Sequence, residues 1–351
     1  MKNFTLGITL MLFIAVSVAN AQTADVKIVK SAKDKSIDVI IGDKLFTSFM
    51  YPDRIEKPVL YPIKAANGTI VTRNFPAGLD PKDPLEPTDH PHHIGLWFNY
   101  ENVNGLDFWN NSEAIPQNKK SQYGWIKTDR ILKAEGGKSK GTIAYHANWT
   151  NQANEVLLEE ITSYEFSGTA NTRIIDRVTT LKANTLVDFK DAKDGMLGIR
   201  LAHALQIPTT KDETFNDSKG IATVVKGGTD KIPTGNYLTS EGKQGDAAWS
   251  TRGKWCMMYG KIGADSISIA IIDNPKNINY PTFWHARGYG LFAANPLGEK
   301  IFTNGKSEKN LKLQKGESVT FRYRIVVSNG KNKLTVNKLY KLADEFAMSK
   351  N

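Results

Sequence analysis

The chain has 351 residues, of which 40% are hydrophobic, and its 46 Lys and Arg against 36 Asp and Glu give a formal net charge of +10. Its 28 glycines (28 of 351, about 8%) raise the apolar share to about 48%, an ordinary globular value that excludes disordered and collagen-like chains. The single cysteine, Cys256, excludes a disulfide scaffold and a Cys-based zinc site, and we expect it in the core. The basic residues are scattered and form no nucleic-acid-binding signature, so we expect no nucleic-acid partner.

The first 21 residues have the pattern of a secretory signal peptide. Lys2 precedes a short apolar run over residues 6–18, and Ala19-Asn20-Ala21 forms a small-residue cleavage motif. The apolar run is too short to span a bilayer comfortably. The sequence therefore predicts cleavage after Ala21, which removes Lys2 and lowers the net charge to about +9. We expect the mature chain, residues 22–351, to be periplasmic or secreted, with no membrane insertion after cleavage.

Alternating apolar and polar residues predict β-strands along most of the mature chain. The clearest alternation runs over 319–327, and 267–271 and 199–207 repeat it, the last with His203 on its apolar face. Apolar residues at helical spacing predict one amphipathic helix over 336–346. Further strands are expected at 159–166, 172–181 and 185–190, and Asn-Gly turns at 67–68, 104–105, 304–305 and 329–330.

This pattern of many strands and one helix predicts an all-β fold. We expect a large two-sheet β-sandwich with a C-terminal helix, forming a single domain over residues 22–351. Five prolines between Phe75 and Pro91 predict an irregular loop there, and 242–248 is a second candidate for a long loop.

Three of the six histidines, His90, His92 and His93, lie within four residues at the end of the proline-rich loop. Imidazole transfers protons near neutral pH and binds metals, and rigid prolines would hold these rings in place. We therefore expect a functional site here, with His90 and His93 as acid or base. A metal site that combines His90 or His93 with His203, His285 or a carboxylate stays open, although the spacing matches no zinc motif.

Aromatic and polar residues follow this histidine cluster closely. Trp97 and Trp109 lie near Asn104 and Asp107, and flat rings beside amides and carboxylates suit the CH faces and hydroxyls of a sugar. The same residues would also fit a core with a hydrogen-bonded turn, so both interpretations stay open.

A second candidate group contains His285 and Arg287, which would share one face of a strand. An imidazole beside a guanidinium can bind and polarise a carbonyl or carboxylate. His203 fits either a core position or a functional one, Arg200 belongs to a charged segment nearby, and His146 is expected at the surface.

Six groups of residues carry a resemblance to a known family: 68–73 with Pro76, 89–98, 103–105 with 107–109, 194–200, 284–291 and 295–298. Together they resemble the PmoA-like family of unknown function, which is common among exported bacterial proteins. Ile94 departs from that family, whose members commonly have Arg after the paired histidines. Members are often labelled methane oxygenase after a membrane subunit with many spanning helices, none of which this sequence predicts, so we reject that label.

The order of Arg73 and Pro76 before a histidine-rich loop is also reminiscent of galactose mutarotase-like proteins. That resemblance implies a β-supersandwich with a sugar-binding cleft on one sheet.

We therefore expect an exported carbohydrate-active protein that performs acid–base chemistry of the epimerase, lyase or hydrolase type on a sugar or sugar derivative. Two alternatives stay open, a non-catalytic glycan-binding module and a metal-dependent lyase or oxygenase. No cofactor is required by the sequence, and a divalent metal is the one candidate. The ligand would be a small molecule or an oligosaccharide. The catalytic candidates are His90, His93, His203 and His285, and the binding candidates are Arg73, His92, Trp97, Asn104, Asp107, Trp109, Arg200, Arg287, Tyr289 and Asn295.

Overall fold

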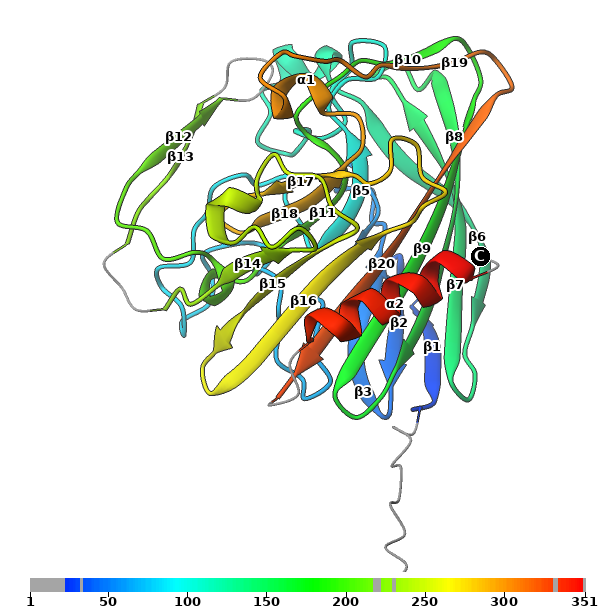
Figure 1. Cartoon of the computed structure of the whole chain (residues 1–351). Coiled ribbons are helices and arrows are strands. Elements are labelled where there is room, and N and C mark those ends of the chain that lie inside the picture. The colour runs from blue at the N-terminus through cyan, green and yellow to red at the C-terminus, as the bar shows by residue number, and fades with distance from the viewer. Residues whose placement is uncertain (1–22, 32–33, 217–221, 229–231, 331–333, 350–351) are drawn as a thin grey trace, which may run out of the picture.

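Two eight-stranded antiparallel sheets packed face to face form the body of the protein (Figure 1). This computed structural model describes residues 23–31, 34–216, 222–228, 232–330 and 334–349, so the expected signal peptide lies outside the described residues. The first sheet has the order β1 (Val26–Ser31), β2 (Ser36–Ile41), β3 (Lys44–Met50), β4 (Val59–Leu60), β5 (Leu96–Tyr100), β11 (Gly195–Arg200), β18 (Leu291–Asn295) and β17 (Phe283–Ala286). The second has the order β14 (Asn236–Thr239), β15 (Trp255–Ile262), β16 (Asp265–Asp273), β20 (Ser318–Asn329), β9 (Thr172–Ala183), β8 (Val156–Gly168), β7 (Lys140–Thr150) and β6 (Trp125–Glu135).

Shorter elements complete the described chain. Two small antiparallel pairs join β10 (Val187–Phe189) to β19 (Leu311–Leu313) and β12 (Glu213–Asn216) to β13 (Ala222–Val225). The helices are α1 (Glu299–Phe302) and α2 (Val336–Met348), and single 3-10 turns occur at η1 (Gln117–Gln122), η2 (His203–Leu205) and η3 (Gly245–Ala248). The expected two-sheet β-sandwich with a C-terminal helix is confirmed.

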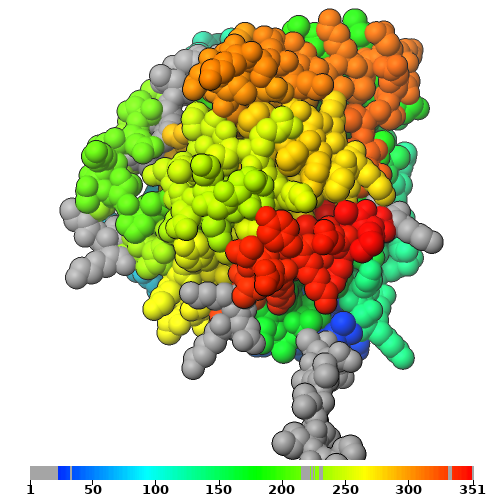
Figure 2. Space-filling view, in the orientation of Figure 1, coloured from blue at the N-terminus to red at the C-terminus, as the bar shows by residue number. Residues whose placement is uncertain are grey.

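The core lies between the two sheets because each strand turns its apolar residues inward. In β20, Phe321, Tyr323 and Ile325 are fully buried in this core, as the period-2 pattern predicts. The C-terminal helix covers the outer face of the second sheet, where Leu339 and Phe346 pack into a separate apolar cluster. Figure 2 shows this helix in red, lying across that side of the molecule.

The strand expected over 199–207 is wrong in its second half. β11 ends at Arg200, and His203 lies in the 3-10 turn η2. The reason is the length of its neighbours, since Ile199 pairs with the first residue of β5 and Arg200 with the first residue of β18. The apolar–polar alternation of the sequence continues beyond Arg200, but neither β5 nor β18 extends far enough to pair with the residues that follow it.

His146 is not at the surface, contrary to expectation. It is 7% exposed in β7, and its Nδ1 lies 2.6 Å from Asp129, at a point where the register of β6 shifts. The Asp129 carboxylate therefore gives the buried His146 imidazole a hydrogen-bond partner that the neighbouring sequence does not reveal.

The outer face of the first sheet is where the histidine-rich loop lies. Leu96 and Phe98 of β5 point into the core, so Trp97 between them points the other way. Arg200 of β11 and Leu291 of β18 lie on the same outer face, since Ile199 and Phe292 face the core. Trp97, Trp109 and Leu291 belong to a separate buried apolar cluster on this outer face.

Candidate functional site

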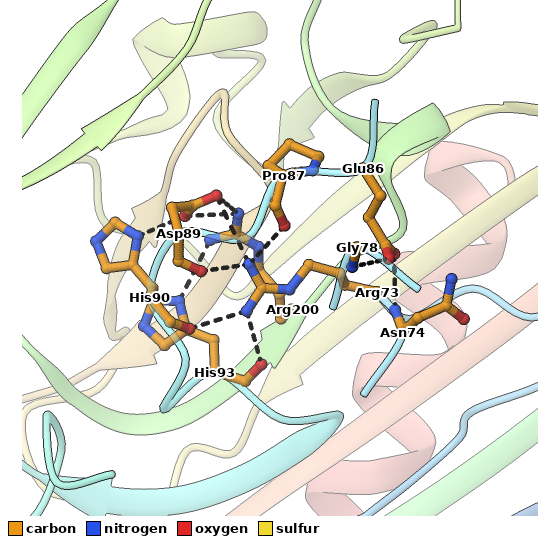
Figure 3. Close-up of polar contacts among 9 residues, drawn as sticks. All are labelled: Arg73, Asn74, Gly78, Glu86, Pro87, Asp89, His90, His93 and Arg200. Carbon is orange, nitrogen blue, oxygen red and sulfur yellow. Dashed lines mark hydrogen bonds and ion pairs between the residues drawn. The ribbon is translucent and has the colours of Figure 1, made fainter. Parts of the chain in front are cut away.

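Backbone hydrogen bonds bring three distant segments together at the end of β11. The Arg73 amide donates to the Arg200 carbonyl at 3.0 Å, and the Arg200 amide donates to the Gly95 carbonyl at 3.0 Å. These two bonds place the segment of Arg73 and the end of the histidine-rich loop on either side of Arg200. The resulting cluster is drawn in Figure 3.

Arg73 holds the histidine-rich loop through its backbone. Its two terminal nitrogens donate to the carbonyls of Pro87, Asp89, His90 and His93 at 2.5–3.3 Å (Figure 3). The side chain is only 3% exposed. A guanidinium offers five donors in a rigid fork, and here four acceptors of one loop surround two of its nitrogens. Arg73 therefore positions the loop and has no terminal nitrogen directed to a ligand.

Asp89 joins the loop to the sheet through charge. One terminal nitrogen of Arg200 lies 2.8 Å from both Asp89 carboxylate oxygens, and His90 Nδ1 lies 2.5 Å from one of them (Figure 3). Burial alone would raise the pKa of Asp89, but the Arg200 charge and the His90 hydrogen bond hold that pKa well below its usual range. Asp89 is therefore an ionised carboxylate shared by a cation and an imidazole.

Four rings form a continuous stack beneath this carboxylate. Tyr289 stacks on His90 at 5.1 Å between ring centroids, His90 on His93 at 4.8 Å, and His93 on Trp97 at 5.0 Å. Arg200 lies 3.3 Å from His93 Nδ1, and because a guanidinium only donates, that nitrogen accepts and Nε2 carries the proton. Burial lowers the pKa of His93 well below its usual value, with the neighbouring His92 and His90 adding to the effect. We infer a neutral ring at His93.

The indoles expected to bind a sugar are buried. Trp97 is 0% exposed and Trp109 1% exposed, and their ring centroids lie 5.1 Å apart. Lys57 lies over Trp97 at 5.6 Å and donates from Nζ to the His92 carbonyl at 2.8 Å. Burial lowers the pKa of Lys57 to about 8. The structure thus gives neither indole an open face for a ligand.

His285 and Arg287 lie close to this cluster but contact other partners. His285 Nδ1 lies 3.3 Å from an Asp194 oxygen, and burial raises the pKa of Asp194 to about 6. The Arg287 guanidinium lies 5.3 Å from the Trp249 ring centroid and 6.0 Å from that of Tyr289.

Asn104, Asp107 and Asn295 bind backbone groups near them. Asp107 accepts from the amides of the two residues that follow Phe108, as a local turn requires. Asn104 lies in a turn beside β10 and is not part of the histidine cluster. The bonds of the two asparagines run from Asn104 to Leu186 and Asp188, and from Asn295 to Ala192, Lys193 and Leu297.

His203 lies apart from the stack, on the wall of a cavity of about 540 Å³ that is also lined by residues 84–89 and Gln206. Its Nδ1 lies 3.0 and 3.1 Å from the two Asp83 oxygens. A carboxylate accepts, so Nδ1 carries a proton. Among the described residues the His203 Nε2 has no hydrogen-bond partner. Two carboxylates of the histidine-rich loop, Glu86 and Asp89, line the same cavity.

The comparisons with known proteins bear on the family. Residues 36–343 match the model described as a family of unknown function, DUF6807. The chain belongs to the DUF6807 family. A family of unknown function is what the sequence resemblance leads us to expect, while the PmoA-like label stays a prediction. No curated protein matches this chain.

Solved structures similar to this DUF6807 protein have low sequence identity. The GH36 α-galactosidase AgaB from Geobacillus stearothermophilus is 11% identical with a TM-score of 0.39, over 88% of this chain and 41% of its own. The Slr1438 protein from Synechocystis is 9% identical with a TM-score of 0.39, over 91% and 99%. A galactose mutarotase-like protein from Clostridium acetobutylicum is 9% identical with a TM-score of 0.36, over 88% and 99%. This DUF6807 chain thus spans about two-fifths of the α-galactosidase.

Two residues at this cavity were not predicted from the sequence: Asp83, which binds His203, and Gln206, which lines the wall. Asp83 contacts His203 from 120 residues away, and the only local sign of it is its place among the loop prolines. Gln206 is 6% exposed, and its Nε2 is buried without a partner.

Across the described parts of this DUF6807 chain, no three His, Cys, Asp or Glu side chains are placed to hold one metal ion. In the same residues, no helix has the length and apolar character needed to cross a bilayer.

Proposed function

We propose that this DUF6807 protein is an exported enzyme that performs acid–base chemistry on a sugar or sugar derivative in the cavity of about 540 Å³. The observation that carries the proposal is the geometry of His203, whose Nδ1 is held by Asp83 while its Nε2 has no partner among the described residues. General bases and acids commonly are imidazoles in which one ring nitrogen is hydrogen-bonded to a carboxylate and the other exchanges the proton with the substrate.

Four polar side chains at or behind this wall have roles in the proposal. His203 Nε2 takes a proton from the ligand or returns one to it. Asp83 holds the ring in the required tautomer and stabilises the imidazolium that forms. Gln206, whose side chain lines the cavity, orients a hydroxyl or carbonyl oxygen of the ligand. Asp89, paired with Arg200, holds this part of the wall in place.

The lining of the cavity supports a ligand of the sugar class. Leu85, Ile207 and the loop prolines give apolar patches, while Thr88, Gln206 and His203 give groups that bind hydroxyls. The volume falls in the range of small-molecule sites. Acid–base chemistry on such a ligand covers epimerase, lyase and hydrolase reactions, which one imidazole does not distinguish.

His203 is assigned the proton transfer ahead of His90 and His93. His93 receives a hydrogen bond from Arg200 and lies between two other rings of the stack. His90 is enclosed by Tyr289 and His93 on its two faces, and its Nδ1 is bound to Asp89. In this proposal both rings support the position of Asp89.

The experiment is incubation of purified protein with a panel of neutral, acidic and keto-sugars, followed by NMR detection of products. Turnover by the wild type that is lost in His203→Gln supports the proposal. Saturable binding without turnover by the wild type overturns it in favour of a glycan-binding module. Turnover that a chelator abolishes and an added divalent metal restores would replace it with the metal-dependent alternative.

A further inference from the structure

A second cavity, of about 280 Å³, lies beside the same loop and is separate from the one that His203 lines. The two cavities share Thr88 in their linings, so the loop over residues 86–91 forms part of both walls. No residue of the acid–base site proposed above, other than this shared loop, lines the smaller cavity.

One wall of the smaller cavity is aromatic. Phe75 is half-buried, and its amide donates to the Tyr61 hydroxyl at 2.8 Å while the two rings meet edge to face at 6.1 Å. The Arg54 guanidinium lies 5.5 Å from the Phe75 ring centroid. A half-buried ring held by a neighbouring tyrosine is a rigid apolar surface, which suits the CH face of a sugar better than the buried Trp97 and Trp109 do.

The polar groups of this cavity are balanced in charge. Two arginines, Arg54 and Arg73, and two glutamates, Glu56 and Glu113, line it. The Arg73 side chain is 3% exposed, and its Nε is buried without a hydrogen-bond partner. A wall that mixes donors and acceptors with little net charge suits hydroxyl groups, which both donate and accept.

We propose that this cavity is an accessory binding site for an uncharged sugar unit, with Phe75 as the surface on which the ring stacks. Ile55, Ile94 and Pro91 complete the apolar wall. Arg54 and Glu113, which line the same cavity, bind hydroxyl groups of the sugar. Binding here requires no proton transfer.

The test is isothermal titration calorimetry of the full chain with maltose, cellobiose and lactose as neutral probes. Phe75→Ala should weaken the binding of the best probe about five- to tenfold, and Phe75→Tyr, which keeps a ring, should bind like the wild type. Leu79→Ala is the matched control, because Leu79 is 71% exposed on the same loop and does not line the cavity. Absence of binding by all three probes, or equal binding by Phe75→Ala and the wild type, would overturn the proposal.

Charged probes test the chemical class. Glucuronate and glucosamine should bind no more tightly than the neutral probes, because the cavity has as many cationic as anionic side chains and offers neither charge a net attraction. Glucuronate that binds tenfold more tightly than maltose, and loses this advantage in Arg54→Gln, would show an anion site instead. The result is independent of the proposed activity: an inactive wild type with Phe75-dependent binding would leave only the accessory site standing, and an active wild type without such binding would overturn the accessory site alone.

Discussion

One terminal nitrogen of Arg200 lies 2.8 Å from both carboxylate oxygens of Asp89, although 111 residues separate the two in the chain. The Arg200 side chain is 0% exposed and that of Asp89 3% exposed. A buried ion pair of this kind adds little net stability over an apolar pair, but removing one partner leaves the other charge uncompensated. The pair therefore links the histidine-rich loop to β11 in a way that tolerates few changes.

Asp89→Asn should destabilise the fold by about 3–5 kcal/mol, because it leaves the Arg200 charge buried without a counter-charge. Urea unfolding followed by circular dichroism measures this loss. The matched control is Asp53→Asn, since Asp53 forms an exposed pair with Lys35 at 2.6 Å and should leave stability unchanged. An equal effect of the two variants would show that the Asp89–Arg200 pair does not hold the loop.

Arg73→Lys should loosen the histidine-rich loop while the sheets remain intact. A lysine ammonium is a compact charge and cannot reach the four carbonyls that the guanidinium binds. We expect amide hydrogen exchange over residues 86–93 to become at least about tenfold faster, with the strands unchanged. Arg54→Lys, on a neighbouring segment, controls for the loss of a guanidinium. Unchanged exchange in Arg73→Lys would contradict the role assigned to Arg73.

The strands that the sequence predicts correctly are those whose pattern is local. β20 is the clearest case, because its predicted alternation over 319–327 lies within the strand and it pairs along nearly its whole length with β9, which is equally long at 12 residues. The strand expected over 199–207 fails because its end depends on where β5 and β18 begin, and no residue near His203 encodes that.

The candidate site divides in the same way. The histidine cluster stands out by spacing alone, so sequence finds the loop. The partner of His203 is invisible, because Asp83 approaches it from 120 residues away. Trp97 and Trp109 have the right residue type for a sugar site, but the loop that packs over them buries both, and that packing depends on Arg73 and Arg200.

Asp273 should make the fold less stable as pH rises from about 4 to about 7. It lies at the end of β16 and accepts hydrogen bonds only from neutral groups, at 2.7–3.0 Å, and burial raises its pKa to about 7. In the unfolded chain the Asp273 carboxyl ionises near pH 4. The folded state therefore binds more protons between about pH 4 and about pH 7, and the free energy of unfolding falls as pH rises. Relative to Asp273→Asn, the wild type should lose on the order of 4 kcal/mol between pH 4 and pH 7.5. Parallel stability curves for the two proteins would contradict this.

The measurement that tests the acid–base proposal most directly compares His203→Gln with His146→Gln on whichever sugar the wild type turns over. Both histidines bind an aspartate through Nδ1, but His203 lines the cavity of about 540 Å³, whereas His146 lies in β7 of the second sheet. We predict that His203→Gln lowers kcat at least about 100-fold while His146→Gln retains the wild-type kcat. A His203→Gln variant with wild-type kcat would contradict the proposal.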